Sequence, residues 1–338
     1  MRRSLSAVLI ATLAATSASA WQRNNKPDEP DVAARVGAPL VREAGGYAVF
    51  QGDLSEFETS PFGSLGEIDT ALETVASHRP ETLSRSWMAY AALVAAQSPE
   101  FVDGVRQTAD YYGRDSVLAG IHNDPSYAGQ LSGADAARQG LLEAVSVDVT
   151  RIREVSATVK QQAYSLQQTS WASASSGDND IRLARLDAVS LQPRDVSSDV
   201  LTSLAAPGAV GSDRMGDATA EVRENFWRAF RLGPGTAHAA GPGAAPVASL
   251  RANPRYQSVL DQVVTLAAFE ALDAANAGDA ASIAPMLDQP DTQQCMRMAR
   301  LHFQQCVAAS HFRYEDPFCI AEHGVKDVGD CFSNVVNQ

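Results

Sequence analysis

The sequence has only four cysteines among its 338 residues, and all of them lie between positions 295 and 331. No apolar run approaches the roughly 20 residues that a membrane-spanning helix needs. Basic residues are also scarce, with 27 Lys and Arg against 40 Asp and Glu. This deficit argues against nucleic acid and anionic membrane surfaces as partners, because both are bound through positive charge.

Motifs that carry chemistry are missing as well. The sequence contains no G-x-S-x-G elbow, Walker loop, HExxH, CxxC or CxxCH pattern. Residues 177–180, GDND, begin like a calcium loop, but Arg182 and Leu183 stand where an EF-hand needs an oxygen ligand and a glycine. The sequence therefore predicts no catalytic, cofactor-binding or metal-binding residues.

The N-terminus has the features of an export signal. Arg2 and Arg3 precede a short apolar stretch, and residues 18–20, Ala-Ser-Ala, form the small-x-small pattern that signal peptidase cuts. We expect residues 1–20 to be a cleaved signal peptide. The mature chain would then be soluble and periplasmic or secreted, with no integral membrane segment and, after losing two positive charges, a net charge of −15 instead of −13.

Helical patterns dominate the rest of the chain. Hydrophobic residues make up 45% of it, and many are alanine, which favours helices over strands. The longest pattern covers residues 134–172, where eight apolar residues are separated by steps of three and four: Leu141, Val145, Val149, Ile152, Val155, Val159, Ala163 and Leu166. We predict a mainly α fold, a helical bundle built around one long helix. A coiled coil with a partner chain is the alternative for this helix.

Composition suggests the domain limits. We expect a flexible leader at 21–44, a helical bundle domain at 45–232, a Gly/Pro/Ala linker at 233–249 and a C-terminal helical segment at 250–338. Residues 45–54, GGYAVFQGDL, are the only good candidate for a short strand. A further helix is predicted within 218–232, from its apolar face.

The cysteine segment begins with a predicted helix over residues 292–308, with Asp291 as N-cap. This helix places Cys295 and Cys306 on one face, eleven residues and roughly 16 Å apart along the axis. A disulfide needs Cα atoms within about 7 Å, so these two cysteines cannot bond to each other. Each must reach one of the cysteines that follow.

The second arm of the segment starts at Asp316-Pro317 and is expected to stop at Gly324. If it returns antiparallel to the first helix, the nested bridges Cys306–Cys319 and Cys295–Cys331 form; crossed pairing would need parallel arms. We therefore predict a disulfide-stapled helical hairpin, as expected in an oxidising compartment. The spacing resembles that of the doubly stapled hairpins of the twin-Cx9C type. We interpret this resemblance as a result of the same helix geometry and not of common ancestry.

Zinc is the alternative to disulfides in this segment. His302 and Cys306 form an i, i+4 pair, and His311, Cys319 and His323 are further candidate ligands. We favour disulfides because paired cysteines in exported proteins are usually bridged. The other three histidines lie in turn-like sequence and are expected to be solvated: His78, His122 and His238.

We expect a non-enzymatic exported protein, a binding, scaffolding or envelope-associated module whose partner is an unknown protein or envelope component. A cell-envelope hydrolase is the alternative, with a histidine and a carboxylate from distant positions as acid and base. The candidates for that pair are His302, His311, His323, Glu315, Asp316 and Glu322. Self-association through the long helix is a third hypothesis.

Overall fold

The computed structural model describes residues 35–205, 250–274 and 280–337, and these are mainly helical. Contacts group Val32–Gln338 into one compact unit. The expected signal peptide, the predicted helix within 218–232, the linker at 233–249 and His238 all lie outside the described residues.

The described elements follow one another in this order. The first part holds α3 (Pro39–Thr59), α4 (Leu65–Ser77), α5 (Pro80–Ala95), α6 (Pro99–Tyr112), α7 (Arg114–Asn123), η1 (Ala128–Gln130), α8 (Ala134–Leu166), α9 (Asn179–Ser190) and α10 (Ser198–Ala205). The second part holds β1 (Arg251–Ala252), η3 (Pro254–Tyr256), α12 (Gln257–Ala271), α13 (Ala280–Ile283), η5 (Ala284–Leu287), α14 (Pro290–Ala309), η6 (Arg313–Glu315), α15 (Asp316–Cys319), the π-helix η7 (Ile320–Lys326), α16 (Asp327–Ser333) and β2 (Val336–Asn337). Within the described residues, no helix is both long enough and apolar enough to span a membrane.

Helix α5 is the most enclosed element. Twelve of its sixteen residues are buried, and it contacts α3, α8, α12 and α14. A helix that is apolar on all sides is stable only inside a core. Trp87 of α5 stacks on Phe332 of α16, with ring centroids 5.4 Å apart, so the C-terminal arm closes over this central helix.

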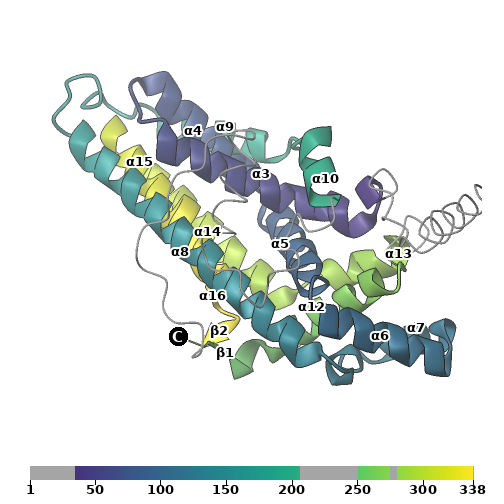
Figure 1. Cartoon of the computed structure of the whole chain (residues 1–338). Helices are drawn as coiled ribbons and strands as arrows, with labels where there is room; N and C mark the ends of the chain where they lie inside the picture. The colour runs from purple at the N-terminus through teal and green to yellow at the C-terminus, as the bar shows by residue number, and fades with distance from the viewer. Residues whose placement is uncertain (1–34, 206–249, 275–279, 338) are drawn as a thin grey trace, which may run out of the picture. The chain divides into compact units, whose positions relative to one another are not determined.

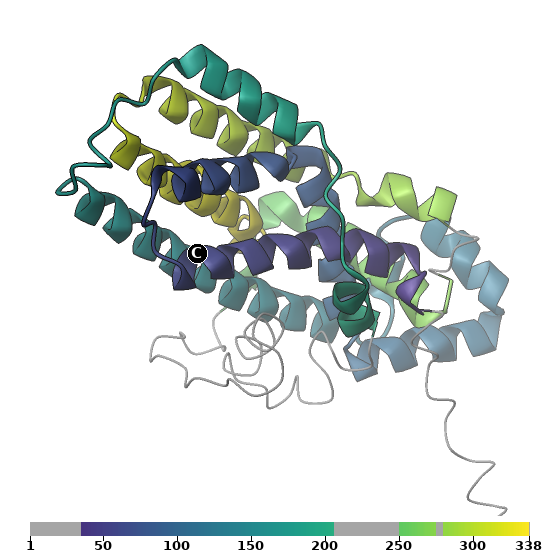
Figure 2. The same ribbon diagram turned by 90° about the horizontal axis from the view of Figure 1, so that it is seen from above.

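Helix α8 is longer, with 33 residues, but it buries only one side. All eight apolar residues of the predicted face are at most 6% exposed, which confirms that face. The helix ends at Leu166 rather than at the predicted residue 172. In Figure 1, α15 and α16 lie alongside α8, and Figure 2 shows α6 and α7 at the end away from α4 and α9.

The strand prediction for residues 45–54 is wrong, and so is the leader's limit at 44, because α3 already begins at Pro39. The apolar residues of this stretch, Tyr47, Phe50 and Leu54, recur at helical spacing and are buried. Gly45 and Gly46 serve close packing rather than a turn: a Cβ atom on Gly46 would lie 2.3 Å from Oγ of Ser86 on α5, and one on Gly45 would lie 2.6 Å from Cγ1 of Val196. Tertiary packing therefore overrides the local strand preference.

Segments on both sides of 233–249 pack into the same core. Helix α12 contacts α5, α6 and α8, and α14 contacts α5 and α9. The predicted division between residues 45–232 and 250–338 therefore does not match the single unit formed by Val32–Gln338. Antiparallel β1 and β2 pair Arg251 with Asn337 close to the end of the chain.

Candidate functional site

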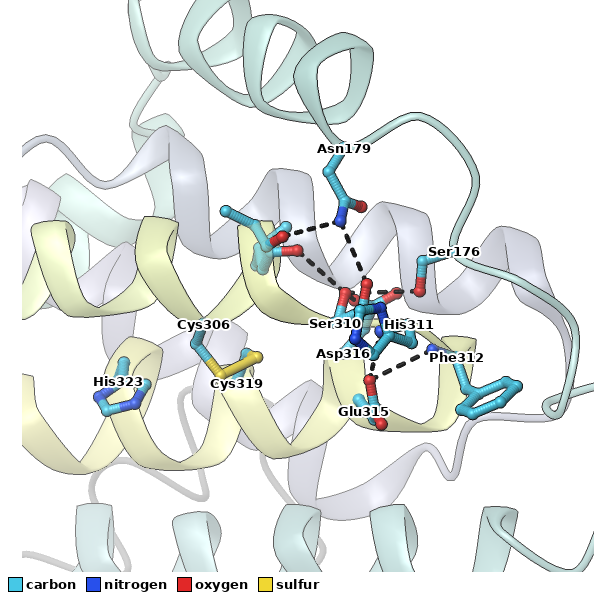
Figure 3. Close-up of a disulfide and its surroundings, with 12 residues drawn as sticks. Ser176, Asn179, Cys306, Ser310, His311, Phe312, Glu315, Asp316, Cys319 and His323 are labelled. Carbon is cyan, nitrogen blue, oxygen red and sulfur yellow. Dashed lines mark hydrogen bonds between the residues drawn. A yellow bond between two sulfur atoms is a disulfide. The ribbon is translucent and has the colours of Figure 1, made fainter.

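Two disulfides join the arms of the C-terminal hairpin. Cys306 is bonded to Cys319 and Cys295 to Cys331, with Cα atoms 5.5 and 5.6 Å apart. Figure 3 shows the inner bridge between the two arms, with His323 farther along the second arm. All four cysteines are disulfide-bonded, so none is available as a metal ligand.

The second arm continues through Gly324, where the sequence predicts a stop. A Cβ atom on Gly324 would lie 2.7 Å from Cγ1 of Val75, and one on Gly329 would lie 2.7 Å from Cγ2 of Ile152. Both glycines therefore let the arm approach α4 and α8 closely. The first arm begins two residues earlier than predicted, at Pro290, and its N-cap is Gln289 instead of Asp291.

The π-helix η7 explains the unequal cysteine spacing. Cys295 and Cys306 are eleven residues apart, which is close to three turns of α-helix, whereas Cys319 and Cys331 are twelve apart. Twelve regular residues would rotate Cys331 about 120° away from the facing arm. The wider turn of η7 takes up the additional residue, because a π-helix bonds residue i to i+5. Both cysteines of the second arm can therefore face α14.

Asp316 anchors the start of the second arm. Its carboxylate is fully buried and accepts hydrogen bonds from Arg182 of α9 and, over 3.1 Å, from Ser310 Oγ. Arg313 Nε lies 3.3 Å from the other carboxylate oxygen without hydrogen-bond geometry. Burial raises the pKa of Asp316, while both arginines oppose this. No substrate could reach this carboxylate, which therefore does not suit the acid/base role considered for it.

The remaining acid/base candidates separate in the structure. The backbone N–H of His311 donates to Glu315 across 2.5 Å, and the described residues offer no hydrogen bond to its exposed ring. Glu322 pairs with Lys160 on α8. Neither Glu315 nor Glu322 is therefore the partner of a histidine ring.

A residue outside the predicted set brings two of the histidines together. Oδ2 of Asp327 lies 3.1 Å from Nδ1 of His302 and 2.9 Å from Nδ1 of His323. The ring centroids of the two histidines are 5.7 Å apart. Asp327 is four residues after His323, and this spacing is the signal by which the sequence could have indicated it. We call these three residues the histidine cluster.

A cavity lies beside the corner between α4 and α5. It has a volume of about 700 Å³, which is within the usual range for a small-molecule site. Its lining comes from α3, from the α4–α5 corner, from residues 191–196 and from η5. We call it the arginine cavity, after Arg42, Arg79 and Arg194.

Some of the charged side chains that line this cavity are paired with an opposite charge and others are not. Arg194 is held by Asp53, and Glu43 lies 3.6 Å from Arg85. Arg42 and Arg79 are exposed, and within the described residues neither guanidinium has a hydrogen bond or ion pair. The cavity therefore offers two positive charges that no described residue neutralises, in a protein whose net charge is −13.

His78 borders the same cavity and is not the solvated loop residue that the sequence predicts. Its side chain is 10% exposed, and Nε2 lies 2.6 Å from Oδ2 of Asp53 on α3. Burial lowers the pKa of His78, although Asp53 opposes this shift. His122, in contrast, is exposed as predicted.

The lowered pKa of His78 predicts a specific pH dependence of stability. In the unfolded chain His78 binds a proton near pH 6.5, whereas in the folded protein it does so only at lower pH. Folded protein should therefore lose stability as pH falls below 6.5, by up to about 1.4 kcal/mol per pH unit. Urea unfolding between pH 7.5 and 5 should show a steeper decline for the wild type than for His78→Gln. Parallel curves would contradict this, because all other histidines are common to both proteins.

The chain has no counterpart among the proteins compared with it: no protein-family model matches, and no curated protein or solved structure shows a significant similarity.

Proposed function

We propose that the protein is an exported binding module that holds an anionic small molecule in the arginine cavity. The observation that carries this proposal is the pair Arg42 and Arg79, two exposed guanidinium groups without a partner among the described residues, on a cavity of about 700 Å³. Carboxylate and phosphate are the groups that a guanidinium binds best, through two parallel hydrogen bonds.

Export is supported by residues 1–20 and by the two disulfides, since such bridges persist in oxidising compartments. A periplasmic or secreted location follows as part of the proposal. We further propose that α8 is the organising helix of the bundle, and that its exposed side is the surface available for self-association or for an envelope protein.

The binding proposal predicts an effect of two substitutions. Inorganic pyrophosphate and citrate should bind to the wild-type protein with saturation in a calorimetric titration. The double variant R42Q/R79Q should bind them at least tenfold more weakly, because each charged hydrogen bond contributes about 1.5 kcal/mol or more. The matched control is Arg251→Gln, an exposed arginine on β1 outside the cavity lining, which should leave binding unchanged. Equal binding by R42Q/R79Q and the wild type would refute the proposal.

The hydrolase alternative has one observation in its favour, which is the pairing of His78 with Asp53 at the cavity. Such a pair can serve as a general base if a nucleophile lies within reach. The nearest hydroxyl in sequence, Ser77 Oγ, donates to the carbonyl of Thr74 across 2.6 Å and accepts from Arg194 across 2.9 Å. Its proton is therefore not directed at His78, which favours binding over hydrolysis. Turnover of an envelope substrate that is abolished in His78→Gln would replace the binding proposal.

A further inference from the structure

The histidine cluster lies, like the inner disulfide, at the interface between the two arms of the hairpin. His302 precedes Cys306 by four residues, and His323 follows Cys319 by four. In antiparallel helices, equal steps away from a linked pair bring the next residues face to face, because positions i and i+4 share a helix side. The 5.5 Å Cα separation of Cys306 and Cys319 therefore determines the register that sets the two imidazoles opposite each other.

The spacing of the three ligand atoms suits a metal ion. One ring nitrogen of His302, one ring nitrogen of His323 and one carboxylate oxygen of Asp327 all lie within 4.8 Å of one another. The two nitrogens are 3.1 and 2.9 Å from Oδ2. Ligand atoms around a tetrahedral ion with bonds of 2.0–2.1 Å are about 3.3 Å apart, so only small side-chain movements are required.

The local backbone supplies a second, independent observation. His323 lies within the π-helix η7, and Asp327 is the first residue of α16 directly after it. π-helical turns are rare and occur frequently at functional sites, because they redirect side chains that a regular helix would place elsewhere. In this hairpin, η7 carries one ligand and ends immediately before another.

Neighbouring cations are engaged by other carboxylates. Lys326 pairs with Asp330 across 3.0 Å, as does Arg153 of α8, and Lys160 pairs with Glu322. Among the described residues, the hydrogen bonds to the Asp327 carboxylate come from the two imidazoles alone, and the Lys326 ammonium acts on it only through its electrostatic field. No ammonium or guanidinium group of the described residues therefore competes at hydrogen-bond distance for the position between the three ligand atoms.

We propose that His302, His323 and Asp327 bind one divalent transition-metal ion, with Zn²⁺ as the type case, as a third cross-link between the hairpin arms. Two imidazole nitrogens and one carboxylate oxygen form a donor set that zinc, copper and nickel accept. The side chain of His302 is 45% exposed, so water completes the coordination. Each imidazole binds through the Nδ1 lone pair and retains its proton on Nε2.

The test is a calorimetric titration of the oxidised, exported protein, without a polyhistidine tag, with Zn²⁺ alone. We expect one ion per chain. His302→Ala and Asp327→Asn should each weaken binding more than the roughly 10- to 100-fold that is lost when only a hydrogen-bond partner of a ligand is removed. The matched control is His311→Ala, an exposed histidine of the same hairpin, which should bind as the wild type does.

Three results would overturn the proposal. They are a wild type that does not bind Zn²⁺ stoichiometrically, an Asp327→Asn variant that binds as tightly as the wild type, and a His311→Ala variant that loses as much affinity as His302→Ala. Circular dichroism of each variant separates loss of a ligand from loss of the fold. Co²⁺ provides a second readout, because its visible absorption reports the coordination directly and should change in His323→Ala.

Discussion

Replacing all four cysteines by alanine is expected to lower the free energy of unfolding by about 6 kcal/mol. In the chain-entropy description, a closed loop of 13 residues contributes about 3 kcal/mol, and the outer bridge spans 36 residues. Because the inner bridge shortens that outer loop, the second contribution is also between about 3 and 4 kcal/mol. A loss of this size is comparable to the total stability of many domains.

Urea unfolding of the oxidised wild type and the four-alanine variant measures this difference. The variant C306A/C319A, which retains the outer bridge, is the matched control and should lose only about 3 kcal/mol. A loss below about 1 kcal/mol for the four-alanine variant would contradict the expectation. In that case the packing of Met296, Phe303 and Val307 on the core would hold the arms without the bridges.

Arg151→Met is expected to destabilise the protein by about 3–5 kcal/mol. Arg151 is 7% exposed and donates to Gln51 and, across 2.7 Å, to Ser55 Oγ, both on α3. Asp148 is 3% exposed, lies one turn earlier on α8 and accepts from the Tyr47 hydroxyl over 3.0 Å. Gln51 Nε2 in turn donates to the Tyr47 hydroxyl over 2.7 Å, so removing the guanidinium breaks a buried polar chain that links it to the Asp148 carboxylate. Removal of one charged partner from such a buried cluster costs about this amount.

Arg153→Met is the matched control for this experiment. Arg153 lies two residues further along α8, is 42% exposed and pairs with Asp330 at the surface. Surface pairs of this kind contribute at most about 1 kcal/mol, because water screens them and the side chains lose freedom. Urea titration of both variants at pH 7 gives their free energies of unfolding. Equal losses would show that the buried hydrogen bonds of Arg151 between α8 and α3 contribute no more to stability than the surface pair of Arg153.

The predictable parts of this fold are those where local spacing decides the structure. The steps of three and four in 134–172 identify the buried face of α8, since only one helix side can carry them. The length of α14 excludes a bridge between its own two cysteines, and the antiparallel return of the second arm then gives the pairs Cys306–Cys319 and Cys295–Cys331. The helix over residues 45–54 is not predicted because Gly45 and Gly46 are explained by packing against Val196 and Ser86, which are distant in sequence.

Both candidate sites depend on contacts between segments that are distant in sequence. Arg42, Arg79 and Arg194 come from three separate segments, so nothing in the sequence groups them on one cavity. Asp327 reaches the two histidines through a π-helical turn, which has no simple sequence signature. The offset of four residues between each histidine and its cysteine is visible in the sequence, but it acquires meaning only once the bridge is known.

The nested bridges also require that α14 forms before the disulfides do during oxidative folding. An oxidant that joined cysteines in the order of their synthesis would link Cys295 to Cys306 first, and this pair is incompatible with α14. Helices form within about a microsecond, whereas disulfide formation takes seconds or longer. Once α14 forms, it therefore keeps its own thiols apart until Cys319 and Cys331 are within reach, and a wrong pair formed earlier is removed by thiol–disulfide exchange.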